Sequence, residues 1–219
     1  LQLVIESVAK LKPDKIYVVI GYQKEEVMKE CSSLPVDFVV QKRQLGTAHA
    51  VLAAQEVLKR EEEKDLLIVN ADLPLLRPET LRPFLRLHQR QKNSLTFLSA
   101  ELENPAGFGR IIREGSKIIK IIEEKDATPT QRKLKKINAG VYLFKIKDLL
   151  QALPKVSNNN KKREYYLTDV IEILIRANRQ VGCYQIPFPE EIIGINSRYE
   201  LAKATELLRD RNIRSLTDN

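Results

Sequence analysis

The sequence is poor in the residues that build metal clusters and covalent cross-links. It has two cysteines, Cys31 and Cys183, and two histidines, His49 and His88, and none of these lies at the spacing of a zinc site. Two distant cysteines provide no disulfide framework, so we expect a protein of a reducing compartment, the cytoplasm. No motif indicates a Ser-His-Asp or Cys-His catalytic set either.

Long apolar runs are also absent. No stretch approaches the roughly 18 apolar residues needed to span a bilayer, so a membrane protein is not expected. The net charge of +8 would suit nucleic acid, a membrane surface or a phosphorylated small molecule. The basic residues are scattered, however, and the densest run, Arg132–Lys136, has no interleaved aromatic residues of the kind that bind single strands. We predict a solvated basic surface and neither a nucleic-acid nor a membrane partner.

An initiating methionine is missing. The chain begins at Leu1 and enters an amphipathic helical pattern directly, without a signal-like segment, so we expect that upstream residues are missing. Its hydrophobic fraction of 43% and charged fraction of 30% are typical of a soluble globular protein. The length favours one large domain, which we predict over residues 1–219.

Strand and helix patterns alternate in the first part of the chain. The predicted strands are 15–20, 36–40 and 66–69, and the predicted helices are 1–12, 23–31, 48–60 and 78–91. This alternation predicts an α/β fold with a mostly parallel sheet flanked by helices. The strands 94–100, 110–113, 117–122 and 137–144 then predict an inserted mixed or antiparallel section. Further helices are predicted at 147–153, 167–177 and 197–210, with short strands at 182–186 and 192–195.

The strand 66–69 leads into Asp72 and Pro74. Its unbroken aliphatic residues predict burial on both faces of a sheet. Ligands of open α/β sheets bind beyond the carboxyl ends of strands, so Asp72 is a candidate ligand of a phosphate-bound Mg²⁺. Asp-x-Pro after a strand is also a common turn or helix cap, and the residues alone leave both interpretations open.

A second stretch, Gln41–Ala50, joins a strand end to a helix start. A glycine at position 46 allows a planar ring to approach the backbone, and Thr47 is a candidate N-cap. The amide groups of Gln41 and Gln44 can complement the donor and acceptor of uracil. A simple helix start explains the same glycine and threonine.

Other polar residues lie at the ends of predicted elements. Gly109 lies at the end of a glycine-lined loop, and Glu123 ends the strand pair that follows it. The carboxylate of Glu123 can bind sugar hydroxyls, or it can belong to a solvated surface. Thr168 fits a helix cap. Asn196 offers a neutral ligand for Mg²⁺ beside Asp72, although a helix N-cap explains it equally well.

The order of the motifs is more specific than any single motif. QLGTAHA, NADLP, GFGRI, IEEKDA, INAG, EYYLTD and GINSR follow one another over nearly the whole chain. In this order they resemble the nucleotidyltransferase domain of the bifunctional bacterial N-acetylglucosamine-1-phosphate uridylyltransferase / glucosamine-1-phosphate acetyltransferase. The resemblance implies a Rossmann-like nucleotide-diphospho-sugar transferase fold. It also implies uridylyl transfer from UTP to N-acetylglucosamine-1-phosphate, which gives UDP-N-acetylglucosamine and pyrophosphate for cell-wall precursor synthesis.

The resemblance assigns roles to residues that the motifs contain. Asp72 and Asn196 would be the catalytic pair that holds Mg²⁺. The implied nucleotide-binding residues are Gln41, Gln44, Gly46 and Thr47. The implied sugar-binding residues are Gly109, Glu123, Asn138, Tyr166 and Thr168.

The chain departs from the family pattern at both ends. The family begins with a strand and a glycine-rich loop, L-A-A-G-x-G-T-R-M, followed by a P-K, and none of these residues is in this sequence. We therefore expect much of the phosphate cradle to be missing. The family's C-terminal left-handed β-helix is absent too, so a homotrimer is expected only of a full-length protein. Two alternatives stay open, namely a different sugar-1-phosphate nucleotidyltransferase, of the glucose-1-phosphate or thymidylyl type, and a non-catalytic nucleotide-sugar-binding domain.

Overall fold

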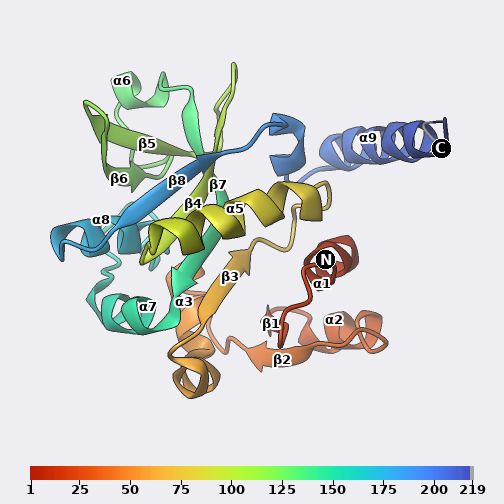
Figure 1. The fold of residues 1–219 in the computed structure, drawn as a ribbon, viewed down its shortest axis with the longest axis horizontal. Helices are drawn as coiled ribbons and strands as arrows, with labels where there is room; N and C mark the ends of the chain where they lie inside the picture. The colour runs from red at the N-terminus through yellow and green to blue at the C-terminus, as the bar shows by residue number, and fades with distance from the viewer. Residues whose placement is uncertain (218–219) are drawn as a thin grey trace.

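A six-stranded mixed sheet with helices packed around it forms the centre of the molecule, as the computed structural model shows (Figure 1). The structure describes residues 1–217, so residues 218 and 219 of the predicted domain lie outside the described residues. The sheet runs in the order β6-β5-β7-β4-β8, and β3 also pairs with β7. Its strands are β3 (Asp65–Val69), β4 (Leu95–Glu101), β5 (Gly109–Glu114), β6 (Lys117–Ile122), β7 (Lys136–Lys145) and β8 (Val181–Gln185). A separate two-stranded sheet contains β1 (Tyr17–Ile20) and β2 (Asp37–Val40).

The helices follow the predicted pattern closely. The α-helices are α1 (Gln2–Ala9), α2 (Lys24–Glu30), α3 (Thr47–Ala53), α4 (Gln55–Leu58), α5 (Pro78–Gln91), α6 (Pro129–Arg132), α7 (Ile146–Ala152), α8 (Asp169–Arg176) and α9 (Arg198–Thr217). Short 3₁₀ helices are η1 (Lys59–Glu61), η2 (Leu153–Lys155) and η3 (Pro189–Ile192). Helix α5 has its predicted bounds, because Pro78 fits the first turn and Lys92 ends the helix in the left-handed conformation.

Two element predictions were wrong in detail. The helix expected over 48–60 is interrupted at Ala54, where the backbone leaves the helical region with φ −89° and ψ 3°. The strand expected at 192–195 is absent, because Ile192 ends the 3₁₀ helix η3. Its side chain is buried in an apolar cluster without any strand pairing, so an apolar pattern alone did not distinguish a strand from a packed turn.

The α/β class and the mixed section are confirmed, but the expectation of a mostly parallel sheet was wrong. Among the described strands, β1–β2 and β4–β8 pair in parallel, whereas β3–β7, β4–β7, β5–β6 and β5–β7 are antiparallel. The long strand β7 causes this difference, since it lies between β4 and both β3 and β5. Alternation of strands and helices in a sequence does not reveal such a late strand inserted among earlier ones.

Strand β7 also divides the core into two layers. Tyr142 and Phe144 point into the cluster formed with α3, α7 and α8. Val141 and Leu143 point into the opposite cluster, which contains Phe84 of α5. This alternation is the period of two that a strand imposes on its side chains. Each fully buried side chain of this kind stabilises the fold by about 1.5–3 kcal/mol, so β7 is held firmly in place.

One edge of β7 has a gap that positions the candidate site. Strand β3 ends with Val69 opposite Val141, and β5 begins with Gly109 opposite Asn138. On this edge, the two residues of β7 between those pairs, 139 and 140, have no strand partner in the described part of the chain. The side chains that follow β3 and precede β5 therefore converge on the opening.

Candidate active site

A cavity of about 640 Å³ runs from this opening along β3. One part of it is apolar and lies between residues 16–19 and 66–69, with α1 and α3 also lining it. The other part is polar and is lined by Asp72, Glu123, Asn138, Thr168 and Asn196. The expected burial of β3 on both faces was wrong, because residues 66–69 are only half-buried along the cavity.

The two predicted metal ligands come together from distant parts of the chain. A Cβ atom placed on Gly194 would lie 2.9 Å from Asp72 Oδ2 and 3.5 Å from Asn196 Nδ2, so both side chains surround the same point. The backbone joins the segments as well, because the Ile195 N–H donates to the Asp72 carbonyl at 3.0 Å. Within residues 1–217, no group of three or more His, Cys, Asp or Glu side chains is arranged to hold a metal.

The helix cap next to Asn196 is made by its neighbours. The Glu200 N–H donates to Ser197 Oγ at 3.2 Å, and Glu200 Oε2 accepts from the Asn196 N–H at 2.7 Å. This reciprocal arrangement satisfies free amides at the start of α9, as in a capping box. The cap therefore uses the backbone of Asn196 and leaves its exposed side chain beside Asp72.

The predicted sugar-binding residues gather around Glu123. Thr168 Oγ1 donates to Glu123 Oε1 at 2.8 Å, and the Cα of Gly109 faces the same carboxylate, since a Cβ there would lie 3.5 Å from Glu123 Oε2. Asn138 is paired with Gly109 across the sheet and donates from Nδ2 to the Tyr142 hydroxyl at 2.6 Å. Strands β5, β6 and β7 thus bring together groups that the sequence separates.

Burial and mutual repulsion raise the proton affinity of several acids here. Burial raises the pKa of Glu123, and the hydrogen bond from Thr168 opposes this shift. Burial, followed by the nearby carboxylate of Glu123, raises the pKa of Asp169 from 3.8 to about 6. Burial also raises the pKa of Tyr166 to about 12, and its hydroxyl has no partner among the described residues. The phenol therefore stays neutral at physiological pH, available as a hydrogen-bond donor.

Two of the predicted nucleotide-binding residues, Gly46 and Thr47, contact the backbone of residues 165–167. Gly46 is the residue before α3, and its φ of +109° places the missing side chain against Tyr165, where a Cβ would lie 2.5 Å from the carbonyl oxygen. The interpretation of Thr47 as an N-cap was wrong, since its hydroxyl accepts from the Leu167 N–H at 2.9 Å. Contact with the neighbouring backbone is therefore sufficient to explain why this residue is a glycine.

The glutamines of this stretch hold the same turn. Gln41 is buried, and its Nε2 lies 3.2 Å from the Gly46 carbonyl and 2.9 Å from His49 Nδ1. Gln44 donates from Nε2 to the Gln41 carbonyl at 3.3 Å. Of the four predicted nucleotide-binding residues, Thr47 lines the cavity, whereas the side chains of Gln41 and Gln44 bond to the chain itself.

Asn70 and Glu191 were given no role from the sequence, and Gly140 was noted only as the glycine of the INAG motif at the head of a strand. Asn70 lies over Gly140, where a Cβ would overlap its amide group, and both line the cavity. Gly140 is required to be glycine for two reasons, namely its φ of +73° and the overlap that a Cβ would make with Asn70. Glu191 is fully buried beside the start of α5, and only the neighbouring motif GINSR pointed to its segment.

A sequence model of the family described as nucleotidyl transferase matches residues 1–188. The chain belongs to the nucleotidyl transferase family. Curated relatives agree with this family. The chain is 42% identical over 216 residues to "Bifunctional protein GlmU" of Clostridium perfringens, covering 99% of the chain and 47% of that relative. It is 44% identical over 210 residues to the protein of the same name from Picosynechococcus sp., covering 95% of the chain and 46% of the relative. The chain thus spans about half the length of these relatives.

Solved structures show the same nucleotidyl transferase fold. The chain is similar to apo UDP-glucose pyrophosphorylase, with a TM-score of 0.72, 15% identity, and coverage of 96% of this chain and 86% of the other. It is also similar to UDP-glucose pyrophosphorylase complexed with UDP-glucose, with a TM-score of 0.66, 14% identity, and coverage of 94% and 86%. Among residues 1–217, every helix is too short or too polar to cross a membrane.

Proposed function

We propose that this chain provides the site at which a uridylyl group passes from UTP to N-acetylglucosamine-1-phosphate, giving UDP-N-acetylglucosamine and pyrophosphate. The main support is the convergence of Asp72, Glu123, Asn138, Thr168 and Asn196 on the polar end of one cavity. Membership of the nucleotidyl transferase family and 42% identity to a GlmU protein over nearly the whole chain favour this reaction over others on the same fold.

The proposed metal is Mg²⁺, held by Asp72 and Asn196. Their side chains surround one point beside Gly194 at the cavity. A carboxylate and an amide oxygen suit this hard cation, which typically takes one or two protein ligands and completes its shell with water and substrate phosphates. When bound, such an ion neutralises charge on the reacting phosphates.

The proposed reaction needs no covalent intermediate with the protein. A phosphate oxygen of the sugar-1-phosphate forms a bond to the α-phosphorus of UTP, and the bond from that phosphorus to the bridging oxygen breaks, so pyrophosphate leaves with the electron pair. The protein's contribution is to align the two substrates. In this proposal the Glu123 carboxylate accepts hydrogen bonds from sugar hydroxyls, Asn138 and Thr168 orient the sugar, and Thr47 contacts the nucleotide side.

The remaining expectations belong to the whole protein. We propose a cytoplasmic enzyme of cell-wall precursor synthesis that becomes a homotrimer through a C-terminal β-helix of the longer relatives' type. Binding of nucleic acid or membrane is not part of this proposal. The scattered positive charge of the chain supports that view, since no interleaved aromatic residues accompany the densest basic run, Arg132–Lys136.

A second candidate function is binding of the nucleotide sugar without turnover. The side chains lining the cavity in the described part of the chain include carboxylates and amides but no lysine or arginine. A triphosphate carries several negative charges, and family sites neutralise them with backbone amides and cations. UDP-N-acetylglucosamine carries fewer charges, so this cavity favours it over UTP.

The two candidates differ in a direct measurement. Calorimetric titration with UDP-N-acetylglucosamine is run beside a coupled assay of pyrophosphate release from UTP and N-acetylglucosamine-1-phosphate. Turnover that requires Mg²⁺ supports the enzyme, and binding without turnover supports the second candidate. Glucose-1-phosphate and thymidine triphosphate, tested in the same assay, decide whether another sugar or base is preferred.

Replacement of Asp72 tests the metal ligand in particular. Asp72→Asn keeps the shape of the side chain and removes its charge, so we expect turnover to fall by about two to four orders of magnitude with an unchanged melting temperature. Asp210→Asn, a change in the long helix α9, is the matched control. Near-normal turnover of Asp72→Asn would contradict the metal role.

A further inference from the structure

Two irregular segments carry the proposed metal ligands. Residues 70–77 lead from β3 to α5 and contain Asp72, and residues 189–197 comprise η3 and its connection to α9 and contain Asn196. Neither ligand belongs to a strand, so the ladder of the sheet does not fix their separation. One backbone hydrogen bond, from the Ile195 N–H to the Asp72 carbonyl, connects them directly.

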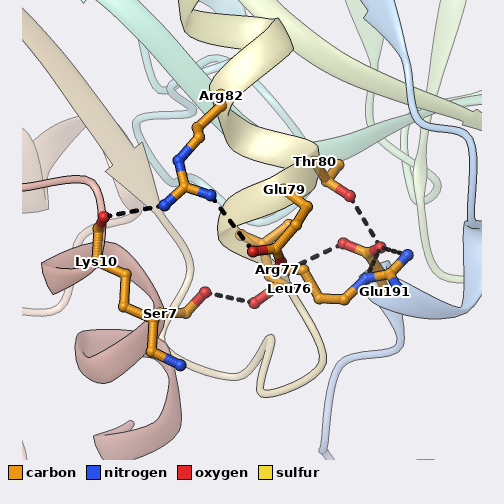
Figure 2. A network of polar contacts seen from close by, with 8 residues as sticks. All are labelled: Ser7, Lys10, Leu76, Arg77, Glu79, Thr80, Arg82 and Glu191. Atoms are coloured by element: carbon orange, nitrogen blue, oxygen red, sulfur yellow. Dashed lines mark hydrogen bonds and ion pairs between the residues drawn. The ribbon is translucent and has the colours of Figure 1, made fainter. Parts of the chain in front are cut away.

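The carboxylate of Glu191 connects the same two segments a second time. Its Oε2 accepts from the Arg77 backbone N–H at 3.0 Å, and its Oε1 accepts from Arg77 Nε at 2.5 Å and from Thr80 Oγ1 at 2.9 Å. Figure 2 shows these contacts converging on Glu191 at the start of α5. The residue has 0% of its surface exposed. A buried charge that accepts three directed hydrogen bonds has little freedom to move.

This carboxylate lies at the start of α5. Arg77 is the N-cap residue of the helix and supplies no side-chain cap of its own. Glu191, from another segment, accepts from the Arg77 backbone N–H, and a negative charge at a helix N-terminus is favourable. The Arg77 guanidinium also stacks over Phe188, 4.4 Å from the ring centroid, so η3 is held from both of its ends.

Other elements hold the same loop by its carbonyl groups. Ser7 Oγ of α1 donates to the Leu76 carbonyl at 2.6 Å, and Arg211 Nη1 of α9 donates to the Leu75 carbonyl at 2.7 Å. Figure 2 shows Ser7 approaching the loop from the side of α1. These contacts restrain residues 75 and 76, whereas Glu191 adds a side-chain connection between this loop and the segment of Asn196.

We propose that Glu191 is a positioning residue that, through Arg77 and the start of α5, keeps Asp72 and Asn196 at the separation that binds a divalent cation. The inference rests on the proposed function, since it takes these two residues as the ligands. A buried ion pair adds little stability compared with apolar side chains of similar volume. Its effect here is geometric, because hydrogen bonds to a carboxylate specify direction and apolar contacts do not.

The test measures Mn²⁺ binding to the chain in the presence of UDP-N-acetylglucosamine, by electron paramagnetic resonance. The variants are Asp72→Asn, Glu191→Gln, the apolar double variant Glu191→Leu with Arg77→Met, and the control Glu103→Gln. The control breaks an exposed ion pair of similar length, Lys135 Nζ to Glu103 Oε2 at 2.6 Å. We expect Asp72→Asn to abolish binding, Glu191→Gln to weaken it by about 10–100-fold, as for other residues that orient metal ligands, and the control to leave it unchanged.

Amide hydrogen exchange separates positioning from general stability. In Glu191→Gln, exchange at Ile195 should rise at least about fivefold while that of the β7 core stays unchanged, because only the local connection is weakened. The apolar double variant should retain the wild-type melting temperature and still lose affinity for Mn²⁺. It also keeps the inference testable when the single variant does not fold.

The outcomes separate the two proposals. If the wild-type protein bound no Mn²⁺, or if Asp72→Asn bound it equally well, the proposed metal site would be overturned and this inference with it. Binding that depends on Asp72 but is unchanged in Glu191→Gln or in the double variant would overturn only the inference. If Glu191→Gln bound Mn²⁺ more weakly and its amide exchange was faster throughout β7, Glu191 would have a general structural role, and the proposal that it positions the metal ligands would be overturned.

Discussion

Replacing Gly46 with alanine tests whether this glycine is required by the fold. The backbone at Gly46 has φ +109° and ψ 177°, a region that is essentially confined to glycine. Forcing alanine into it costs about 1–3 kcal/mol. The new Cβ would also lie 2.5 Å from the Tyr165 carbonyl oxygen and 2.8 Å from its nitrogen, both closer than the 3.0 Å below which Cβ contacts are essentially never seen.

The neighbouring backbone has little freedom to move away from that Cβ. The Tyr165 N–H donates to the Leu45 carbonyl at 2.7 Å, and the Tyr165 carbonyl accepts from the Ala48 N–H at 2.9 Å. Overpacking of such a site costs a further 1–3 kcal/mol, roughly. We therefore expect Gly46→Ala to lower the free energy of unfolding by about 2–6 kcal/mol in urea titrations.

Gly115→Ala is the matched control. Gly115 also has a positive φ, +58°, but a Cβ there meets nothing within 4 Å. It should lose only the conformational term, about 1–2 kcal/mol. If both variants lost the same amount, or if Gly46→Ala lost less than the control, contact with Tyr165 would not be the reason for the glycine.

Two further predictions concern the acidic side of the site. Because the folded-state pKa of Asp169, about 6, exceeds its ordinary value of 3.8, the contribution of this carboxyl group to stability is greatest below pH 4 and is lost as pH rises through 6. Asp169→Asn removes this loss, so its free energy of unfolding should exceed that of wild type by about 1–2 kcal/mol at pH 8 and equal it at pH 3.5, as measured by urea unfolding. This magnitude is reduced from the full effect of the pKa shift because the side chain is only partly buried. Thr168→Val removes the hydroxyl that donates to Glu123, so the pKa of Glu123 should rise further. The free energy of unfolding of the variant should be lower by about 1–3 kcal/mol. Calorimetry should show that the variant reaches its full affinity for UDP-N-acetylglucosamine at a higher pH than wild type does.

Each of these has a contrary result. Asp169→Asn that is less stable than wild type at pH 8 would mean that the favourable charge at the start of α8 outweighs burial and repulsion. Thr168→Val with an unchanged pH dependence of binding would mean that Glu123 does not contact the sugar in its ionised form. Nuclear magnetic resonance titration of the Glu123 carboxyl carbon distinguishes that result from a failure to shift its pKa.

Local patterns predicted much of the architecture. The bounds of α5 follow from Pro78 and from the spacing of buried residues such as Leu81 and Phe84. Hydrophobic periodicity reports on contacts within a few residues, which is why most strands and helices were placed well. The same signal misread Ile192, whose apolar side chain packs in the core from a 3₁₀ turn.

Single motifs left the roles of the candidate-site residues open, and the order of the motifs assigned them. No spacing rule connects Asp72 to Asn196, and their approach around Gly194 is visible only in three dimensions. Glu191 gave no signal of its own, because a glutamate in a charged segment is ordinarily solvent-exposed. Its burial depends on Arg77, which lies far from it in the sequence.

Patterns along the chain were enough to establish the α/β class, the succession of strands and helices, and the family whose motifs the chain carries. Those properties depend on side-chain periodicity and on residues that are close along the chain. Other features became visible in three dimensions alone, namely the antiparallel pairing of β3 with β7, the close approach of Gly46 to Tyr165, and the connection that Glu191 makes between the two segments of the proposed metal site. Strand pairing, close backbone approach and buried ion pairs form between distant residues, and the chain must fold before any of them exists.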